Sequence, residues 1–177
     1  MSRRLASLSA VTGVIALAAC DPPPRPARAP EAALVTAVTP TAAADIPEAV
    51  RVVALAARPG MVISGAELKE REGRRYYDVE GSLNGAEIEL DLLETQHGWR
   101  VVEIQRDLVW TAVPADVRAA AESARAGFTP VRVIESVQAD DGAVIYELFA
   151  DGQPATPALE VRKTGRRVEV LREVWPH

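Results

Sequence analysis

The sequence predicts an α+β fold of two tandem units, in each of which one helix packs on an antiparallel four-stranded meander sheet. Three observations lead to this prediction. Residues 113–175 repeat the pattern of residues 46–110, each copy begins with apolar residues at helical spacing, and each copy continues with apolar and polar residues in alternation. The 177 residues are 48% hydrophobic, which is enough to build a buried core.

The repeat consists of the same residue types at matching places. The stretch IPEAVRVVALAARPG, from Ile46, and the stretch VPADVRAAAESARAG, from Val113, share a proline, a valine, two arginines and a glycine in register. Further along, YYDVEG and IYELFA align Tyr77 with Tyr146, and each copy closes on a strand that ends in a tryptophan. Two copies of one supersecondary unit are therefore expected.

A helix is predicted at the start of each copy. Pro47 and Pro114 suit the first helical turn, where an amide hydrogen has no partner within the helix, and Asp45 is a candidate cap for the first helix. Gly60 and Gly127 follow the residues with helical spacing, so the helices are expected to end there.

Four strands are predicted after each helix. In the first copy they are separated by the turns Glu72-Gly73, Asn84-Gly85 and His97-Gly98. Asn-Gly is a strong hairpin signal because both residues tolerate a positive φ. In the second copy Pro154 and Pro157 widen the middle connection and favour an edge position there. The expected strands are residues 62–70, 75–82, 86–93 and 99–108, and then 131–138, 143–150, 158–163 and 166–175.

The N-terminus has the features of a targeting segment. Two arginines precede an uncharged run over residues 5–19, which is shorter than the roughly 20 residues that a membrane-spanning helix needs. Leu17-Ala18-Ala19-Cys20 resembles the lipobox of bacterial lipoprotein signal peptides. The resemblance implies that residues 1–19 are a cleaved signal peptide and that Cys20 carries the lipid. The alternative is an ordinary secretory signal, or a cysteine packed as a small apolar residue.

Asp21, directly after Cys20, resembles the signal that keeps some lipoproteins in the inner membrane of Gram-negative cells. A diacylglyceryl group with a second, amide-linked chain is enough for stable anchoring without a protein span. Residues 20–45, with six prolines and many alanines, are then expected to form an extended or disordered tether. The sequence thus predicts a lipid-anchored protein on the periplasmic side of a Gram-negative cell envelope.

The charge distribution argues against nucleic-acid binding. The formal net charge of −5 comes from 20 basic and 25 acidic residues, which are well mixed after residue 45. Such a chain offers no basic surface to phosphate groups, so no nucleic-acid partner is expected. Cys20 is the only cysteine, which rules out a disulfide within the chain.

The helix followed by a meander, the glycine turns before YYDVEG and IYELFA, and the closing strands that begin with Gly-x-Arg-Val resemble the PepSY and PepSY-like family. The resemblance covers residues 46–175. The tandem arrangement is also similar to the β-lactamase inhibitory protein fold, in which paired sheets form a concave binding surface. These resemblances imply a secreted or anchored protein that binds or inhibits other proteins, and they carry over no catalytic residue. The acidic third strand and the prolines of the second copy depart from the family pattern.

No catalytic residue, metal ligand or cofactor is predicted. His97 lies in an expected surface turn and His177 is the last residue, and neither has a serine elbow or a second ligand at a useful spacing. Glu87, Glu89 and Asp91 alternate along one predicted strand, where they could bind a cation or handle protons. A solvated strand face, neutralised by arginines across the sheet, is the simpler interpretation of these acids.

A candidate contact surface is indicated by two adjacent tyrosines. Tyr76 and Tyr77 point to opposite faces of one strand, so Tyr76 lies on the open face if Tyr77 packs under the helix. An exposed tyrosine is an efficient contact residue in protein interfaces. The candidate binding residues are Tyr76, Arg74, Arg75 and Glu80.

Three functions fit the sequence to different degrees. The favoured hypothesis is a non-catalytic binding or regulatory module that presents a sheet surface to another envelope protein. The alternative is a small-ligand or cell-wall binder that uses the cleft between the units, which needs a deep pocket with convergent polar groups. The third is a hydrolase, whose acid–base chemistry would have to rest on carboxylates alone.

Overall fold

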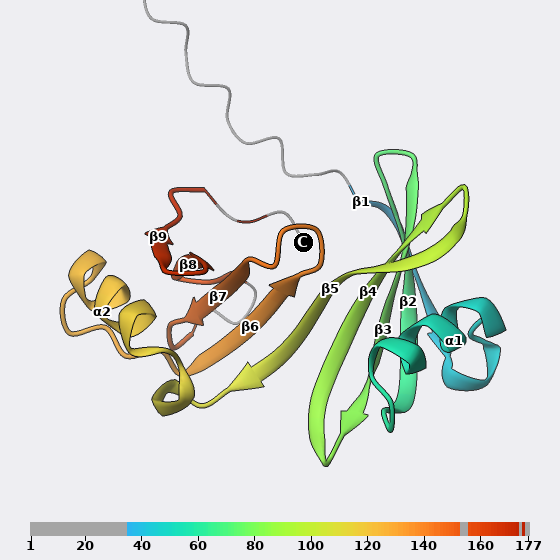
Figure 1. Ribbon diagram of the computed structural model, residues 1–177, viewed down its shortest axis with the longest axis horizontal. Coiled ribbons are helices and arrows are strands. Elements are labelled where there is room, and N and C mark those ends of the chain that lie inside the picture. The colour runs from blue at the N-terminus through green and yellow to red at the C-terminus, as the bar shows by residue number, and fades with distance from the viewer. Residues whose placement is uncertain (1–34, 153–155, 174, 176–177) are drawn as a thin grey trace, which may run out of the picture.

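The chain folds around one antiparallel sheet of nine strands, shown in the computed structural model of Figure 1. The structure describes residues 35–152, 156–173 and 175. The strands lie side by side in chain order. They are β1 (Val35–Ala42), β2 (Val62–Arg71), β3 (Arg74–Leu83), β4 (Ala86–Thr95), β5 (Gly98–Leu108), β6 (Arg132–Gln138), β7 (Val144–Phe149), β8 (Leu159–Thr164) and β9 (Arg167–Val170).

Two α-helices accompany the sheet. α1 (Glu48–Ala57) follows the short 3-10 helix η1 (Ala43–Asp45), and α2 (Ala115–Ala124) follows the short 3-10 helix η2 (Trp110–Ala112). The chain therefore passes twice through a 3-10 turn, a helix and four strands, with β1 in front of the first passage. We call β1 to β5 the first half of the sheet and β6 to β9 the second half.

The prediction of two separate helix-on-sheet units is wrong, because the strands of both copies join in one continuous sheet. β5 pairs with β6 from Glu103 opposite Gln138 to Leu108 opposite Val133. An unpaired β5 would expose a row of backbone donors and acceptors, and β6 satisfies them. The alternation of apolar residues shows which face of a strand is buried. It does not show which strand lies alongside, so the join is invisible in the pattern.

A ninth strand comes from the segment predicted to be a tether. β1 pairs with β2 along its length, and η1 then leads into α1. The tether prediction is therefore wrong for residues 35–45. Pro40 is compatible with β1 because β1 is an edge strand, where a missing backbone N–H need not interrupt a ladder.

The first turn of α1 forms without a side-chain cap. Pro47 is the N-cap residue, and its carbonyl oxygen accepts hydrogen bonds from the backbone N–H groups of Val50 (2.9 Å) and Arg51 (3.1 Å). Asp45 lies in η1 instead, so its predicted capping role is wrong. α2 begins after Pro114, whose carbonyl oxygen accepts a hydrogen bond from the backbone N–H of Arg118 (3.0 Å), and the backbone N–H of Val117 is bonded to Oδ1 of Asp116 (3.0 Å).

Each helix covers one half of the sheet. α1 buries Val50 and Ala54, and α2 buries Val117 and Ala121, at equivalent positions of the repeat. The strand residues in these two cores include Tyr77, Val79, Leu90 and Leu92 in the first half and Tyr146, Leu148 and Val161 in the second. Burying a large apolar side chain contributes about 1.5–3 kcal/mol, so the two cores hold the helices against the sheet.

Both helices lie on the outer sides of the molecule in Figure 1, with α1 beside the first half and α2 beside the second. β5 and β6 run between the two halves, and the sheet twists so that the faces without a helix are turned toward each other. We call the sheet face that no helix covers the uncovered face, and it is the face on which a binding site has room.

The N-terminal predictions concern residues outside the described ranges. These predictions are the signal peptide over residues 1–19, the lipidation of Cys20 and the sorting role of Asp21. Within the described ranges, neither helix is long and apolar enough to cross a membrane. The lipid anchor thus stays a prediction from the sequence.

Candidate functional site

Four carboxylates come together on the uncovered face of the first half. Both residues of the Asn84-Gly85 turn have positive φ, and this hairpin places Asp78 on β3 directly opposite Asp91 on β4. Asp91 in turn lies opposite Glu103 on β5. Glu89 precedes Asp91 by two residues, so its side chain leaves the strand on the same face. We call Asp78, Glu89, Asp91 and Glu103 the acidic floor.

The acidic floor is largely shielded from solvent. Only 5% of Asp78, 7% of Asp91 and 4% of Glu103 is exposed, and Glu89 is half-buried. The interpretation of the β4 acids as a solvated strand face is therefore wrong for Asp91 and Glu89, and it holds for the exposed Glu87 alone. The reason is that β3 and β5 flank β4 on both sides and place their own side chains over the same face.

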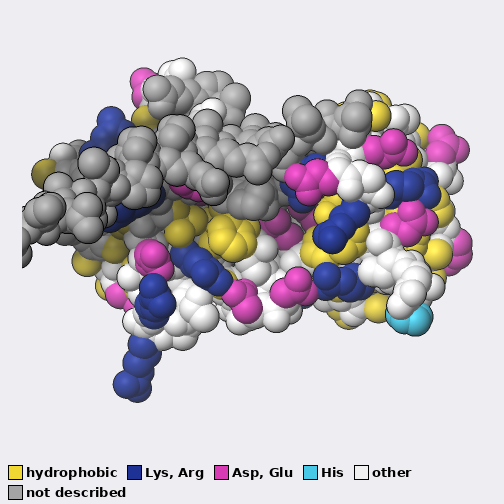
Figure 2. All heavy atoms as spheres, turned by 90° about the horizontal axis from the view of Figure 1, so that it is seen from above, with side chains coloured by type: hydrophobic (Ala, Val, Ile, Leu, Met, Phe, Trp, Pro, Cys, Tyr) yellow, Lys and Arg dark blue, Asp and Glu magenta, His cyan; other side chains and the backbone are white. Residues whose placement is uncertain are grey.

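The acidic floor lies in a hollow of about 250 Å³. Tyr76 and three arginines border the hollow, and we call Arg71, Arg74 and Arg100 the arginine rim. Arg100 is ion-paired with Asp140 of the β6–β7 turn (Nη1 to Oδ1, 2.6 Å), so the second half contributes to the wall. Seen from above in Figure 2, acidic and basic side chains are interspersed on this side of the molecule.

The members of the floor differ in their partners. The ammonium group of Lys69 is ion-paired with Oδ2 of Asp78. Glu103 accepts hydrogen bonds from the hydroxyl of Ser136 and from Nε2 of Gln105 (3.3 Å). Oδ1 of Asp91 is buried and has no hydrogen-bond partner in the described part of the chain. Such an oxygen costs about 1–3 kcal/mol, and more when it is ionised, unless a proton or a ligand satisfies it.

Burial and mutual repulsion disfavour negative charge on the floor. Burial, and then the charges of Asp78, Glu103 and Glu89, raise the pKa of Asp91 well above its usual value. Burial and then the charge of Asp78 raise the pKa of Glu89 to about 7. Burial also raises the pKa of Asp78, although the hydrogen bond and the charge of Lys69 oppose the rise. Glu89 is therefore partly protonated near neutral pH, and burial disfavours the ionised forms of Asp78 and Asp91 as well.

Lys69 is the basic partner within this group of acids. Its own burial disfavours its charge, but the hydrogen bond and the attraction to Asp78 outweigh that effect and raise the pKa of Lys69. Asp91 and Glu89 add further attraction. Lys69 thus stays protonated and contributes one positive charge beside the carboxylates.

The second half carries an equivalent pair of acids. Glu147 on β7 lies directly opposite Glu160 on β8, each 69 residues after its counterpart in the first half, and both are buried. Trp175, a described residue near the C-terminus, contacts one member of this pair. The backbone N–H of Trp175 donates a hydrogen bond to Oε2 of Glu160 (2.6 Å), and the guanidinium carbon of Arg162 lies 5.3 Å from the centre of the Trp175 ring.

The structure divides the four residues that the sequence suggested for binding. Arg74 and Tyr76 line the hollow, and the guanidinium carbon of Arg71 lies 4.9 Å from the centre of the Tyr76 ring. Arg75 leaves β3 on the opposite side and is ion-paired with a glutamate of β4 (3.0 Å). Glu80 is on the uncovered face but borders a neighbouring hollow. Two of the four therefore meet at the acidic hollow.

Half of the floor, and the neighbouring Lys69, were missed from the sequence. Lys69, Asp78 and Glu103 come from three different strands, so no pattern along the chain connects them. One signal was present. Asp78 and Asp91 are equally far from the two-residue turn Asn84-Gly85, and such a turn places equidistant residues opposite each other. Glu103 could not be placed in this way, because the β4–β5 register shifts next to Asp91.

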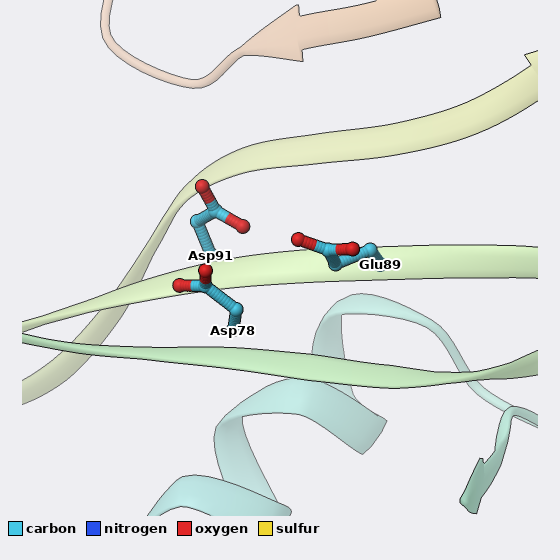
Figure 3. Close-up of side chains that lie close together, drawn as sticks. All are labelled: Asp78, Glu89 and Asp91. Carbon is cyan, nitrogen blue, oxygen red and sulfur yellow. The ribbon is translucent and has the colours of Figure 1, made fainter. Parts of the chain in front are cut away.

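Three floor carboxylates are close enough to act together. Asp78, Glu89 and Asp91 can each offer one oxygen such that all three oxygens lie within 4.8 Å of one another. Figure 3 shows the three side chains converging from β3 and β4. Carboxylates at this separation can share protons, accept hydrogen bonds from basic groups, or hold a cation that prefers oxygen ligands.

Comparison with known proteins finds no family model, no curated protein and no solved structure that matches this chain. The PepSY-like resemblance and the lipobox at Cys20 thus stay predictions from the sequence. The geometry of the acidic hollow is what bears on function.

Proposed function

We propose that the protein is a lipid-anchored, non-catalytic binding module of the bacterial cell envelope, which holds a segment of another envelope protein in the acidic hollow. The anchor in this proposal is the predicted lipid on Cys20, with Asp21 favouring the inner membrane. The binding site is the acidic floor with the arginine rim around it.

One observation carries the proposal, and it is the difference in cover between the two halves. In the second half Trp175 contacts one acid of the pair, because its backbone N–H is donated to Glu160 and its ring lies beside Arg162. In the first half the equivalent acids lie in a hollow. A polypeptide segment is therefore an occupant that this face of the sheet already accepts.

The arginine rim indicates the chemistry of the segment. Arg74 and Arg100 are exposed, and Arg71 is half-buried against Tyr76. Guanidinium groups bind carboxylates in a planar, two-pronged geometry, so a segment with Asp or Glu side chains fits the rim. Charges of this kind mainly set specificity and the rate of association. Tyr76 adds an aromatic contact beside them.

Photocrosslinking in cells that produce the protein tests the binding site. A photoreactive amino acid at Tyr76 should give an adduct with one envelope protein, and Arg74→Glu should reduce the adduct at least about ten-fold because it reverses a rim charge. The same amino acid at Val52, exposed on α1, is the control. No adduct at Tyr76, or identical adducts at both positions, would refute the proposal.

The anchor has a separate test. Cys20→Ala should abolish labelling of the protein by a fatty-acid probe, because the thiol is the proposed site of lipid attachment. Normal labelling of this variant would show that the lipid is attached elsewhere. The result does not depend on the identity of the protein partner.

A small polar ligand is the second candidate, and one observation favours it. A neighbouring hollow of about 650 Å³ opens on the same face and is bordered by Glu80, Arg106 and Arg132 among others. This volume lies within the range of small-ligand sites. NMR screening with charged fragments should shift the amide signals of these residues, and a screen without such shifts would remove this candidate.

A further inference from the structure

The ligand geometry of the floor suits one particular kind of ion. The candidate oxygens of Asp78, Glu89 and Asp91 lie within 4.8 Å of one another. Calcium binds oxygen at 2.3–2.6 Å, so oxygens on opposite sides of the ion are about 5 Å apart. For magnesium the corresponding separation is about 4.2 Å in a strict octahedron. Oxygens within 4.8 Å of one another can therefore surround a calcium ion.

A second observation points to a ligand independently of the clustering. Asp91 is 7% exposed, it projects into the group shown in Figure 3, and its Oδ1 has no hydrogen-bond partner in the described ranges. Buried polar atoms are rarely left without a partner, because an unsatisfied group is costly. An ion at the centre of the three carboxylates would satisfy this oxygen.

At the point where the three carboxylates meet, acids outnumber bases, although the arginine rim borders the same hollow. Three carboxylates converge on one place, while the basic group bound to them is Lys69, through Oδ2 of Asp78. Asp78 has a second carboxylate oxygen besides the one that pairs with Lys69. The side chain of Lys69 is long and is one third exposed. Lys69 can therefore stay in place or move aside when an ion enters.

We propose that Asp78, Glu89 and Asp91 form a calcium-binding site on the uncovered face. Three carboxylates supply up to six of the six to eight oxygens that calcium takes, and water supplies the rest. The site lies beneath the arginine rim, so bound calcium and the arginines together would face an incoming carboxylate. The site rests on the floor itself and not on the proposed protein partner.

Isothermal titration of the purified full chain with calcium chloride tests the site. The protein is first freed of metal with a chelator and is then titrated at about pH 8, where protons compete less for the carboxylates. The expected result is one ion per chain with a dissociation constant of about 0.1–1 mM, the range of extracellular calcium modules. Magnesium chloride should bind at least about ten-fold more weakly. Absence of saturable calcium binding by the unaltered chain would overturn the proposal.

The repeat supplies a matched control. Asp91→Asn should weaken calcium binding at least about ten-fold, because it removes a charged ligand. Glu147→Gln alters an acid at the equivalent buried place of the second half and should leave the calcium affinity unchanged. Equal weakening by both variants would contradict a site in the first half, because it would indicate a general effect of lost charge.

The calcium affinity of Lys69→Gln distinguishes a calcium site from a cluster of acids that only supports the fold. Removal of the resident positive charge should strengthen calcium binding about three-fold or more, since nearby like charges repel. Unchanged or weaker binding would contradict the proposal. Because the titration uses purified protein, its failure is distinguishable from failure of the crosslinking at Tyr76.

Discussion

The two halves of the sheet carry the same pair of facing acids in different surroundings. In the second half, Glu147 and Glu160 are buried opposite each other, and the backbone of Trp175 donates a hydrogen bond to Glu160. In the first half, Asp78 and Asp91 lie in a hollow with two further carboxylates, and Lys69 is ion-paired with Asp78.

This difference separates the structural part of the repeat from the part available for binding. The hairpin register brings two acids to the same face at equivalent places in both halves. In the second half the backbone N–H of Trp175 bonds one oxygen of Glu160, while the other, Oε1, is buried as Oδ1 of Asp91 is. In the first half Oδ1 of Asp91 has no such donor among the described residues, so a proton, an ion or a partner has to supply it.

The comparison of the two cores predicts the largest effect. Leu90 is fully buried under α1, and its counterpart Leu159 in the second half is partly buried. Leu90→Ala should lower the free energy of unfolding by about 3 kcal/mol, and Leu159→Ala by about 1 kcal/mol, because the cavity and the lost contacts scale with burial. Urea unfolding measures both, and equal losses would contradict the asymmetry.

A glycine marks a second difference between the halves. A Cβ atom at Gly81 would clash with the carbonyl oxygen of Val62 and with the side chain of Met61, beside the bulge of β2. The second half has Ala150 at the matching place. Gly81→Ala should cost about 2 kcal/mol through strain, whereas Ala150→Gly should cost less than about 1 kcal/mol. Thermal unfolding of the two variants measures both losses of stability. A larger loss for Ala150→Gly than for Gly81→Ala would contradict the prediction.

The acid pairs should respond to neutralisation with opposite signs. Folding raises the pKa of Asp91, so its contribution to stability declines as the pH rises from the unfolded carboxyl range near about 4 toward the raised value. At about pH 8, with a chelator present, Asp91→Asn should therefore stabilise the protein by about 1 kcal/mol. Glu160→Gln should destabilise it by about 1 kcal/mol, because it weakens the acceptor for Trp175. Changes of the same sign in urea unfolding would contradict the comparison.

The smallest effect concerns a residue that the sequence suggested for binding. Arg75 is ion-paired with Glu94 at the surface, on the side of β3 away from the hollow. Arg75→Gln should lower the free energy of unfolding by less than about 0.5 kcal/mol, and it should leave calcium affinity unchanged. A loss of calcium binding in this variant would show that the calcium site also depends on residues of the opposite sheet face.

Local features of this fold could be predicted because neighbours in sequence determine them. Pro47 and Pro114 before the helices, and Asn84-Gly85 between β3 and β4, act through their own backbone geometry. The opposite faces of Tyr76 and Tyr77 result from the pleat of a single strand. These features could therefore be predicted without knowing how the rest of the chain folds.

The features that were missed depend on pairing between distant segments. The join of β5 to β6 turns two expected units into one sheet, and β1 extends the sheet with residues that a proline-rich composition assigned to a tether. The acids of β4 have the alternation of a solvated face, and it is β3 and β5 that bury Asp91. Composition and spacing carry little information about such neighbours.

The most direct test of the central difference between the halves is an NMR titration of the metal-free full chain with calcium chloride. Backbone amide signals of residues 78, 89 and 91 should shift and saturate together, and those of residues 147 and 160 should stay in place. Absence of shifts in the first half, or equal shifts at both acid pairs, would contradict the proposed difference between the halves.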